Sequence, residues 1–592
     1  MKQFQLAYEN DISFQSELEK IDHWRSANPS YTTIFRIYAS GVDMEEIKHV
    51  CDILDEKMPD ALYLGCASHA NILDGAFADA KITMSCTIFE YETTRVKLLQ
   101  LPFTEDRMID SARELKEYCD ANEWVSSVEM HATILGMPMR DFCAELCTLR
   151  SDIQVFGGGA CNPDISDMGT TVFSKGKGFS TYGIVFLLLG GSDFHTYSMY
   201  ISGWNPLERK FKVTRAERSV VYELDGEPAF NIYSRFLNIE NNYDLVPNTL
   251  EFPLLMNDDG VDVLRSLIRV NDDDNSIIYT SEVPEGSDVR LAYGDPEMIL
   301  TSIRHDGQNI ADFQPDVIQV FSCAARKAFW SDENVSDETL VLNSIAPTSG
   351  FYTSGEFLRL DGIVRNFNST LVIAAMREGE PKNERIISLY DAKLSEKESK
   401  RINLIRRFNA FIAASTAEFE ELNRKLIVTS ITDGLTKLYN RAEIESRIRS
   451  AIEERMQEEA PGALSLIMID IDDFKKINDV YGHKEGDSVI VGISDVLRNV
   501  MSGVPSSAIG RWGGEEFMVL LPDSDINAAT ELAERIRTEF AAITYELSGC
   551  HTVSIGVAQA KDGEDADSLY CRVDEALYVA KANGKNQIVK QD

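Results

Sequence analysis

The sequence lacks a hydrophobic run long enough to cross a membrane, and basic residues are scarce in it. The longest apolar run, Tyr182–Gly190, is about half of the roughly 20 residues that a membrane helix needs. The 592 residues include 58 Lys and Arg but 96 Asp and Glu, which gives a net charge of −38. Such a chain repels phosphate on average, which argues against a general binder of nucleic acid or of anionic membranes. We therefore expect no nucleic-acid partner and no membrane insertion.

Signs of a secretory signal and of paired cysteines are missing as well. The first residues carry Glu9, Asp11 and Glu17 and have no apolar core, so we expect no secretory signal there. The ten cysteines form no Cys-x-x-Cys pair, and the nearest two, Cys143 and Cys147, have the helical spacing of packed thiols rather than of a metal site. We expect a reduced, cytoplasmic protein without structural disulfides.

The first 380 residues or so read as mixed α and β. With 44% hydrophobic and 26% charged residues the chain is globular, and its length predicts roughly three or four domains at about 100–200 residues each. Apolar runs predict strands at Thr33–Tyr38, Ala61–Leu64, Val128–Leu135 and Ile184–Leu189. Amphipathic patterns predict helices at Met44–Lys57 and Asp106–Cys119.

Glycine and proline are absent from residues 394–429, where charges of both signs alternate. Apolar residues fall on two positions of a heptad, the first with Ile405, Ile412, Phe419 and Leu426, and the second with Phe408 and Leu422. Ser415 and Thr429 weaken the second position. The pattern favours a parallel two-stranded coiled coil at residues 390–430, although one amphipathic helix packed on a domain would look similar.

From residue 431 onward helices and strands alternate, and the order fits an antiparallel α+β sheet with helices on one face. We expect helices at Glu443–Gln457, Asp487–Val500, Asn527–Phe540 and Asp567–Ala582. The expected strands are Leu464–Ile471, Ala508–Trp512, Phe517–Leu521, Thr552–Ala558 and one near Gln587–Lys590.

Four acids mark a candidate site in this last segment. Asp470 ends a strand and Asp472 follows two residues later, so that both point to the same side of the backbone. Glu515 and Glu516 follow the Gly513-Gly514 turn of a hairpin. Together these acids can form an oxygen-rich site for Mg²⁺ or Mn²⁺. Taken singly, each acid would be an exposed loop carboxylate.

The same residues carry a family resemblance. Asp470-Ile-Asp-Asp-Phe-Lys-Lys-Ile-Asn-Asp-Val-Tyr-Gly-His-Lys-Glu-Gly-Asp487 and Gly513-Gly-Glu-Glu-Phe517 closely resemble the GGDEF family of diguanylate cyclases. The flanking signatures agree: Asp433-Gly-Leu-Thr436, Tyr439-Asn-Arg441, Val553-Ser-Ile-Gly-Val-Ala558, Asp574-Glu-Ala-Leu-Tyr-Val-Ala-Lys581 and Gly584-Lys-Asn586. The resemblance covers residues 431–592 and implies a sheet flanked by helices, like the palm of nucleotidyl cyclases.

The family joins two GTP molecules into cyclic di-GMP with release of two pyrophosphates, in a homodimer whose protomers each hold one GTP. The resemblance implies two Mg²⁺ (or Mn²⁺) ions per active half-site, ligated by Asp470, the backbone carbonyl of Ile471 and Glu515. Glu516 would be a further ligand or assist deprotonation of the attacking hydroxyl. Two such ions can organise an in-line attack on a phosphate.

Asn478 and Asp487 match the family's guanine-binding positions. A carboxylate accepts from the N1–H and the N2 amino group of guanine, a donor pair that adenine lacks. Asp487 could also cap a helix after Gly486. Phosphate contacts would fall to Lys475, Lys581 and Lys585, where the last stands at a position that is arginine in many relatives.

One departure from the family concerns product inhibition. Many relatives carry an Arg-x-x-Asp motif shortly before the glycine hairpin, whereas the matching stretch here is Val504-Pro-Ser-Ser507. Because the arginine fork for the product is missing, we expect no feedback inhibition through this site.

The front half resembles the FIST sensory module in four stretches: Tyr63-Leu-Gly-Cys-Ala-Ser68, Val155-Phe-Gly-Gly-Gly-Ala160, Phe321-Ser-Cys-Ala-Ala-Arg326 and Gly350-Phe-Tyr-Thr-Ser-Gly-Glu356. The resemblance implies a FIST N domain at residues 1–215 and a FIST C domain at residues 216–385. It also implies a small-molecule ligand, with amino acids as one class. Arg326 and Glu356 could hold the carboxylate and the amine of such a ligand, or be ordinary charges.

The combined interpretation is a diguanylate cyclase controlled by a small-ligand sensor through a dimeric coiled coil. The main alternative is a catalytically silent, nucleotide-binding signalling scaffold. Synthesis of a mixed GMP–AMP dinucleotide is a second alternative, disfavoured by Asp487. A third makes the front half an enzyme, although no nucleophile–base pair in the sequence supports it.

Overall fold

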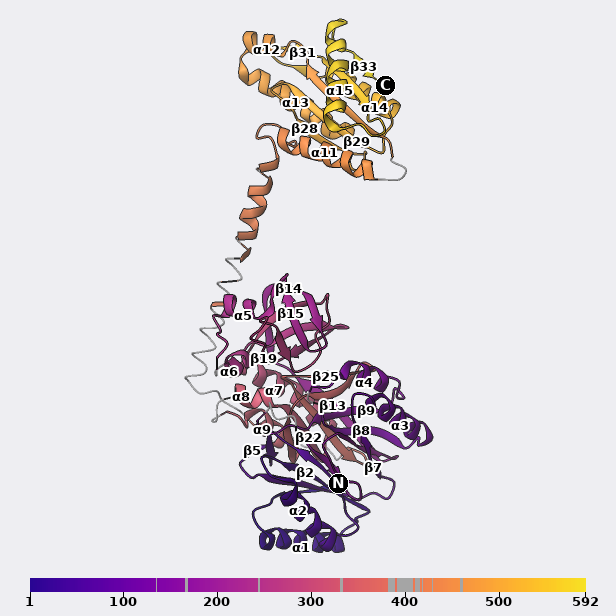
Figure 1. The fold of residues 1–592 in the computed structure, drawn as a ribbon, viewed down its shortest axis with the longest axis vertical. Coiled ribbons are helices and arrows are strands. Elements are labelled where there is room, and N and C mark those ends of the chain that lie inside the picture. The colour runs from indigo at the N-terminus through magenta and orange to yellow at the C-terminus, as the bar shows by residue number, and fades with distance from the viewer. Residues whose placement is uncertain are drawn as a thin grey trace. The chain divides into compact units, whose positions relative to one another are not determined.

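The computed structural model describes the chain except for residues 135, 165–168, 243–244, 331–333, 382–388, 391–407, 410–411, 413–415, 418, 429, 458–461 and 592. The chain folds into two compact units, Met1–Ala410 and Phe411–Asp592 (Figure 1).

Three six-stranded sheets form most of the first unit. The first sheet has the order β1 (Lys2–Ala7), β6 (Ile82–Phe89), β2 (Thr32–Ala39), β3 (Leu62–Ala67), β10 (Val172–Ser174), β11 (Gly178–Ser180). The second has the order β25 (Ile363–Phe367), β24 (Glu356–Leu360), β9 (Gln154–Gly159), β8 (Val125–Ala132), β12 (Gly183–Gly190), β7 (Arg95–Pro102). The third has the order β13 (Phe194–Ile201), β26 (Leu371–Glu378), β22 (Val317–Cys323), β23 (Thr348–Thr353), β4 (Ala70–Leu73), β5 (Ala76–Ala78).

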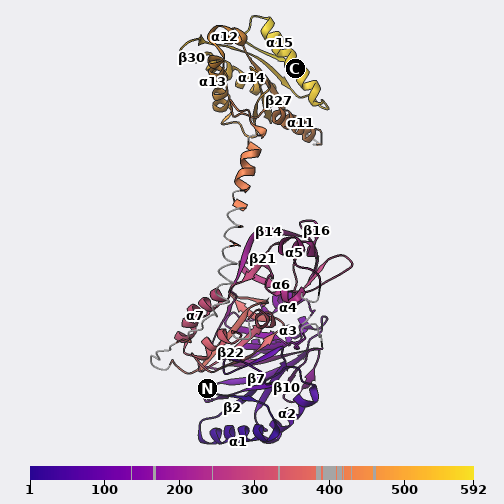
Figure 2. The same cartoon turned by 90° about the vertical axis from the view of Figure 1, so that its left-hand side faces the viewer.

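Each of these sheets contains one parallel pair, β2–β3, β8–β9 or β22–β23. A parallel pair needs a crossover connection, and each crossover here contains helix. The helices that pack on the three sheets are α1 (Asp11–Ala27), α2 (Met44–Lys57), α3 (Met108–Ala121), α4 (Met139–Leu146), α7 (Pro296–Phe313), α8 (Ala324–Phe329) and α9 (Asp337–Asn343) (Figure 1; α1, α2, α3, α4 and α7 also in Figure 2). The inner faces of the sheets pack on one another, so that Leu64, Leu187 and Phe321 from the three sheets share one core.

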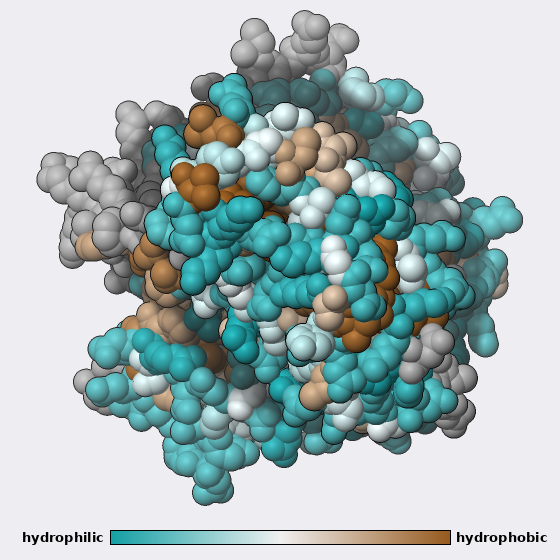
Figure 3. Space-filling model, turned by 90° about the horizontal axis from the view of Figure 1, so that it is seen from above, coloured by the Kyte–Doolittle hydropathy of each residue, from teal (hydrophilic) through white to brown (hydrophobic). Residues whose placement is uncertain are grey.

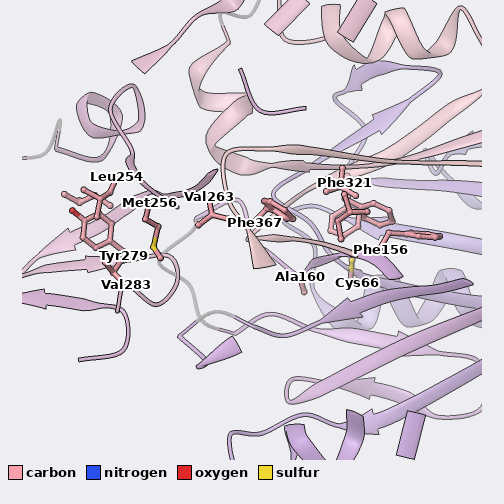
Figure 4. Close-up of a cluster of buried hydrophobic side chains, with 14 of the residues drawn as sticks. Cys66, Phe156, Ala160, Leu254, Met256, Val263, Tyr279, Val283, Phe321 and Phe367 are labelled. Atoms are coloured by element: carbon pink, nitrogen blue, oxygen red, sulfur yellow. The ribbon is translucent and has the colours of Figure 1, made fainter. Parts of the chain in front are cut away.

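The fourth sheet has eight strands and continues this core. Its strands are β18 (Val261–Arg265), β17 (Leu254–Asp258), β21 (Asp288–Gly294), β14 (Trp204–Glu217), β15 (Val220–Leu224), β20 (Ile277–Tyr279) and β19 (Leu267–Val270), with β16 (Glu227–Pro228) paired to β15. The short helices α5 (Ala229–Leu237) and α6 (Leu245–Leu250) accompany it. Figure 4 shows Leu254 and Tyr279 of this sheet and, farther along the same cluster, Phe156 and Phe321.

Strands from distant parts of the sequence share sheets in this unit. The late strands β24 and β25 join the second sheet, and the early strands β4 and β5 join the third. The expected border between residues 215 and 216 lies inside β14. The two expected FIST domains therefore lie in one compact unit.

The second unit is built on a five-stranded sheet in the order β28 (Ala508–Arg511), β29 (Glu516–Pro522), β27 (Leu464–Ile471), β32 (Val553–Gln559), β33 (Ile588–Gln591). All pairs are antiparallel except β32–β33. The helices are α11 (Arg441–Gln457), α12 (Phe474–Tyr481), α13 (His483–Met501), α14 (Ile526–Ala541) and α15 (Ala566–Ala582), and a small hairpin joins β30 (Thr544–Tyr545) to β31 (Gly549–Cys550).

The prediction of helices on one face of this sheet was wrong. Ile467 and Ile469 of β27 share a core with α12, α13 and α14, whereas Leu466 and Met468 share one with α11 and α15. All eight residues of β27 are buried, because successive side chains of a strand point to opposite faces and both faces are covered.

We call residues 390–430, where a coiled coil is expected, the connector; its residues 419–428 are helical. Three apolar residues on its expected heptad, Phe419, Leu422 and Leu426, are 54–62% exposed, so the single chain leaves this face uncovered. Ile405, Ser415 and Thr429 lie outside the described residues. The dimeric coiled coil stays a prediction.

All ten cysteines have free thiols in the structure. In the described part of the chain, no helix is both long enough and apolar enough to span a bilayer. The face of the molecule in Figure 3 is mainly hydrophilic, with hydrophobic residues in small separate groups.

Candidate active site

The candidate site lies where β27 ends beside the tip of the β28–β29 hairpin. Asp470 of β27 is in register with Glu516 of β29. The amide of Ile471 donates to the carbonyl of Glu515, with an N–O distance of 3.3 Å. The structure thus brings the expected metal ligands Asp470, Ile471 and Glu515 to one edge of the sheet, with Glu516 beside them.

Burial and the neighbouring charges shift the pKa of Asp470. Burial raises the pKa of its carboxyl to about 6; the ion pair with Lys581 acts against that shift, and the charges of Glu515 and Glu516 add to it. The charges of Glu515 and Glu516 beside the buried Asp470 favour a cation at this position, and carboxylate and carbonyl oxygens are the ligands that Mg²⁺ and Mn²⁺ prefer. The donor set therefore fits a divalent cation by its chemistry. In the arrangement of the described residues, no three His, Cys, Asp or Glu side chains already enclose a metal position.

Asp472 has a different role from the one that strand alternation suggested. Its carboxylate accepts hydrogen bonds from Thr552 Oγ1 at 2.7 Å, Ser554 Oγ at 2.6 Å and the amide of Asn586 at 3.0 Å. Asp472 thereby anchors β32 and the turn before β33, instead of joining Asp470 in an open oxygen-rich site.

Two of the three expected phosphate-binding lysines form ion pairs with acidic residues in the region of the site. Lys581 Nζ lies 2.7 Å from Asp470 Oδ2, and Lys585 Nζ lies 2.8 Å from Asp473 Oδ1. Lys475 is an exposed residue of α12. Their contacts with phosphate stay a prediction.

The two expected guanine-binding residues flank Gly486. A Cβ atom at Gly486 would lie 2.0 Å from Asn478 Oδ1, so only glycine leaves room for that amide. The amide oxygen of Asn478 is buried, and no residue that the structure describes donates a hydrogen bond to it. Helix α13 begins at His483 after the N-cap residue Gly482. Asp487 therefore lies inside the helix and is exposed, and the expectation that it caps the helix was wrong.

Sequence reasoning missed the role of Arg511. Its guanidinium donates to the carbonyls of Gly513 and Gly514 in the hairpin turn and to both carboxylate oxygens of Asp433, at 3.2 and 3.3 Å. The motif Asp433-Gly-Leu-Thr436 was visible in the sequence, but its distance from the hairpin concealed this contact.

The stretch that replaces the product-inhibition motif forms the turn between α13 and β28. Ser507 Oγ donates to the carbonyl of Val504 at 2.9 Å, and Ser506 has a φ of +60°. Both ends of the stretch are uncharged, as the sequence shows.

Arg326 and Glu356, the two residues considered for the sensor ligand, are fully buried and have protein partners. Arg326 donates to Glu338 Oε2 at 2.6 and 3.2 Å and to two backbone carbonyls. Glu356 accepts from the hydroxyls of Thr353 at 2.5 Å and Thr370 at 2.8 Å. Burial raises the pKa of Glu356 to about 8, with these hydrogen bonds acting in the opposite direction. That Arg326 and Glu356 bind a ligand stays a prediction.

A second buried network, missed by the sequence analysis, lies between the sheets of the first unit. Arg36 of β2 donates to Glu129 of β8 at 2.8–3.0 Å, and His131 Nε2 lies 2.9 Å from Glu129 Oε1. All three residues are 0% exposed. Burial would raise the pKa of Glu129, but Arg36 and His131 hold it at about 2. The only signal in the sequence is a charge within an apolar strand.

Comparison with known proteins assigns families to both units. Residues 34–227 match the FIST N domain, residues 229–359 match the FIST C domain, and residues 430–587 match "Diguanylate cyclase, GGDEF domain".

The diguanylate cyclase DgcM of Escherichia coli K12 is 43% identical over 125 residues, which are 21% of this chain and 30% of that protein. A diguanylate cyclase of Vibrio cholerae is 36% identical over 178 residues, which are 30% of this chain and 54% of that protein. The GGDEF domain of DgcB from Caulobacter crescentus, solved with c-di-GMP, is 34% identical and aligns with 27% of this chain and 95% of its own, at a TM-score of 0.26. The chain thus combines FIST N and FIST C domains with a GGDEF domain of the diguanylate cyclase family.

Proposed function

We propose that the protein is a diguanylate cyclase that condenses two GTP molecules into cyclic di-GMP and releases two pyrophosphates. The proposal is carried by the meeting of Asp470, Glu515 and Glu516 at one sheet edge. In each half-reaction the 3′-oxygen of one GTP bonds to the α-phosphorus of the other, and the bond to pyrophosphate breaks.

Some residues of the site would bind the metal, and others would recognise the guanine base and the phosphates. Asp470, the carbonyl of Ile471 and Glu515 would hold Mg²⁺ or Mn²⁺, which polarises phosphate oxygens and lowers the pKa of the attacking hydroxyl. Glu516 stands beside these ligands and would accept the hydroxyl proton. Asn478 and Asp487 would accept hydrogen bonds from guanine, and Lys475, Lys581 and Lys585 would contact phosphate.

Control would come from the first unit. The half-sites of two protomers must face each other before the attack can occur, so the geometry of a dimer sets the rate. The uncovered face with Phe419, Leu422 and Leu426 suits a parallel coiled coil with a second copy. A small molecule bound to the FIST domains would act by favouring one dimer geometry.

Turnover of GTP tests the proposal. The full-length protein is incubated with GTP and Mg²⁺, and the products are separated by chromatography. We expect cyclic di-GMP from the wild type, none from Glu515→Ala or Glu516→Ala, and wild-type amounts from Glu531→Ala, which removes an exposed acid of α14. GTP binding without product, also in a domain forced to dimerise, would contradict the proposal and support the silent scaffold.

A further inference from the structure

Lys581 occupies the position of a counter-ion in the metal site. It stands in the last turn of α15, and its ammonium nitrogen lies 2.7 Å from Asp470 Oδ2. Asp470 is only 7% exposed, so this contact is held at the buried end of β27. The ammonium group of Lys581 thus directly contacts Asp470, which is a metal ligand in the proposed function.

The contact sets up a competition. Asp470 Oδ2 cannot contact the ammonium group of Lys581 and a divalent cation equally well at the same time. The two positive charges also repel each other at this range. Glu515 and Glu516 also lie near enough to act on Asp470 electrostatically, so the site without Lys581 would gather three negative charges. Lys581 thus stabilises the empty site and opposes a cation that enters alone.

A nucleotide changes this balance. The triphosphate of GTP brings negative charge, and an ammonium group at the end of a four-carbon stem can rotate toward it. Lys581 is 37% exposed, so its side chain has solvent into which it can turn. Once Lys581 contacts phosphate, Asp470 is released to the metal.

We propose that Lys581 is a built-in counter-ion that opposes binding of a divalent cation to the empty site. When a nucleoside triphosphate binds, Lys581 turns to its phosphates, and Asp470 becomes free to ligate the metal. The inference rests on the proposed function, because it takes Asp470 as a metal ligand. It makes metal and nucleotide binding mutually cooperative, and linkage requires that each strengthens the other by the same factor.

Lys585 provides a matched control. It follows α15, and its Nζ makes an ion pair of similar length, 2.8 Å, but with Asp473, which is 62% exposed and not an expected metal ligand. Removing the charge of Lys585 changes the net charge of the protein as much as removing that of Lys581, but leaves the ion pair of Asp470 in place.

The experiment measures Mn²⁺ binding by the electron paramagnetic resonance signal of free Mn²⁺. The full-length wild type, Lys581→Met, Lys581→Arg, Lys585→Met and the double variant Asp470→Asn/Lys581→Met are titrated without nucleotide. The titrations are repeated with α,β-methylene-GTP, which cannot release pyrophosphate. Thermal unfolding checks that each variant is folded.

Without nucleotide, we expect Lys581→Met to bind one additional Mn²⁺ about tenfold more tightly than the wild type, because the competing ammonium is gone. Lys581→Arg and Lys585→Met should bind like the wild type, and the gain should vanish in the double variant. The nucleotide analogue should raise Mn²⁺ affinity in the wild type more than in Lys581→Met.

Equal or weaker Mn²⁺ binding by folded Lys581→Met without nucleotide would overturn the inference while leaving the proposed function intact. A gain that persists in the double variant would overturn it as well, because the added ion would then not use Asp470. If the wild type binds no Mn²⁺ at the site even with the analogue, the proposed function itself fails, and the inference falls with it.

Discussion

Arg511 joins Asp433 to the glycine turn at the tip of the β28–β29 hairpin. The arginine reaches Asp433 with one nitrogen, at 3.2 and 3.3 Å, and the carbonyls of Gly513 and Gly514 with the others. Asp433 follows the connector helix within a few residues. A movement at the end of that helix would therefore reach the turn that carries Glu515 and Glu516 through one side chain.

Weakening this link should slow catalysis without unfolding the domain. Arg511→Lys keeps the charge but loses the planar fork that bridges the carboxylate and two carbonyls. We expect kcat to fall by roughly 10- to 100-fold, because a small displacement of reacting groups has effects of that size. Steady-state cyclic di-GMP formation measures it, and thermal unfolding serves as the check on the fold.

Asp433 also caps its own turn, because Thr436 donates to it from both its amide and its hydroxyl. Thr436→Val removes the hydroxyl bond but leaves Arg511 in place, and it is the control. If this variant lost as much activity as Arg511→Lys, the effect would belong to the turn rather than to the arginine link.

The buried pair of Arg36 and Glu129 should matter for folding of the first unit. Glu129→Gln leaves the guanidinium of Arg36 without its counter-charge, and breaking a buried ion pair from one side costs about 3–5 kcal/mol. Chemical denaturation of the full-length protein should show this loss in the transition of the first unit. Glu123→Gln, an exposed position just before β8, should leave that transition unchanged. A loss below about 1 kcal/mol for Glu129→Gln would contradict the prediction.

Glu356 should make the first unit less stable as pH rises. Burial raises its folded-state pKa to about 8 from the ordinary 4.5, so between these values the folded chain holds a proton that the unfolded chain has lost. The free energy of unfolding therefore falls with increasing pH across this window, by up to about 1.4 kcal/mol per pH unit. Glu356→Gln cannot ionise, and its unfolding free energy should have a flatter pH profile than the wild type between pH 5 and pH 8. Parallel profiles for the two proteins would refute the prediction.

Several elements could be predicted from the sequence because local signals decide them. Helix α2 runs over Met44–Lys57 as predicted, since Asp43 accepts from the amide of Glu46 at its start and apolar residues recur on one face. The acids of the candidate site could be identified because the end of a strand and the tip of a hairpin are both local features. Leu466 to Ile469 form an unbroken apolar run in β27, which is typical of a strand covered on both faces. This run indicates helices on both faces of the sheet, and the prediction of helices on one face did not take it into account.

What could not be predicted depends on contacts between distant residues. Nothing near Glu356 indicates that β24 would join β9 in the second sheet. Asp472 looked like a partner of Asp470 until Thr552 and Ser554 supplied its hydrogen bonds. In each case the role of the residue depends on a partner that is distant in the sequence. The spacing of residues along the chain does not reveal that partner.

Product inhibition should be absent at the turn between α13 and β28. Val504 and Ser507 stand where many relatives have an arginine and an aspartate, so the turn offers neither a fork for phosphates nor an acid for guanine. Initial rates should be the same with and without added cyclic di-GMP. Non-competitive inhibition that persists after Ser507→Ala would show a product site elsewhere, whereas inhibition abolished by that change would contradict the prediction.

Gly486 should govern the affinity for GTP through Asn478. In Gly486→Ala the new Cβ would lie 2.0 Å from Asn478 Oδ1, and the nearest alternative neighbour, a Phe474 ring atom at 3.2 Å, leaves it little space. The amide has to move, so we expect KM for GTP to rise by roughly tenfold, as for the loss of one buried hydrogen bond, with a smaller change in kcat. Gly503→Ala is the matched control, because a Cβ there meets no atom within 4 Å. Equal KM values for the two variants would mean that Asn478 does not contact the base, and guanine recognition would then rest on Asp487 alone.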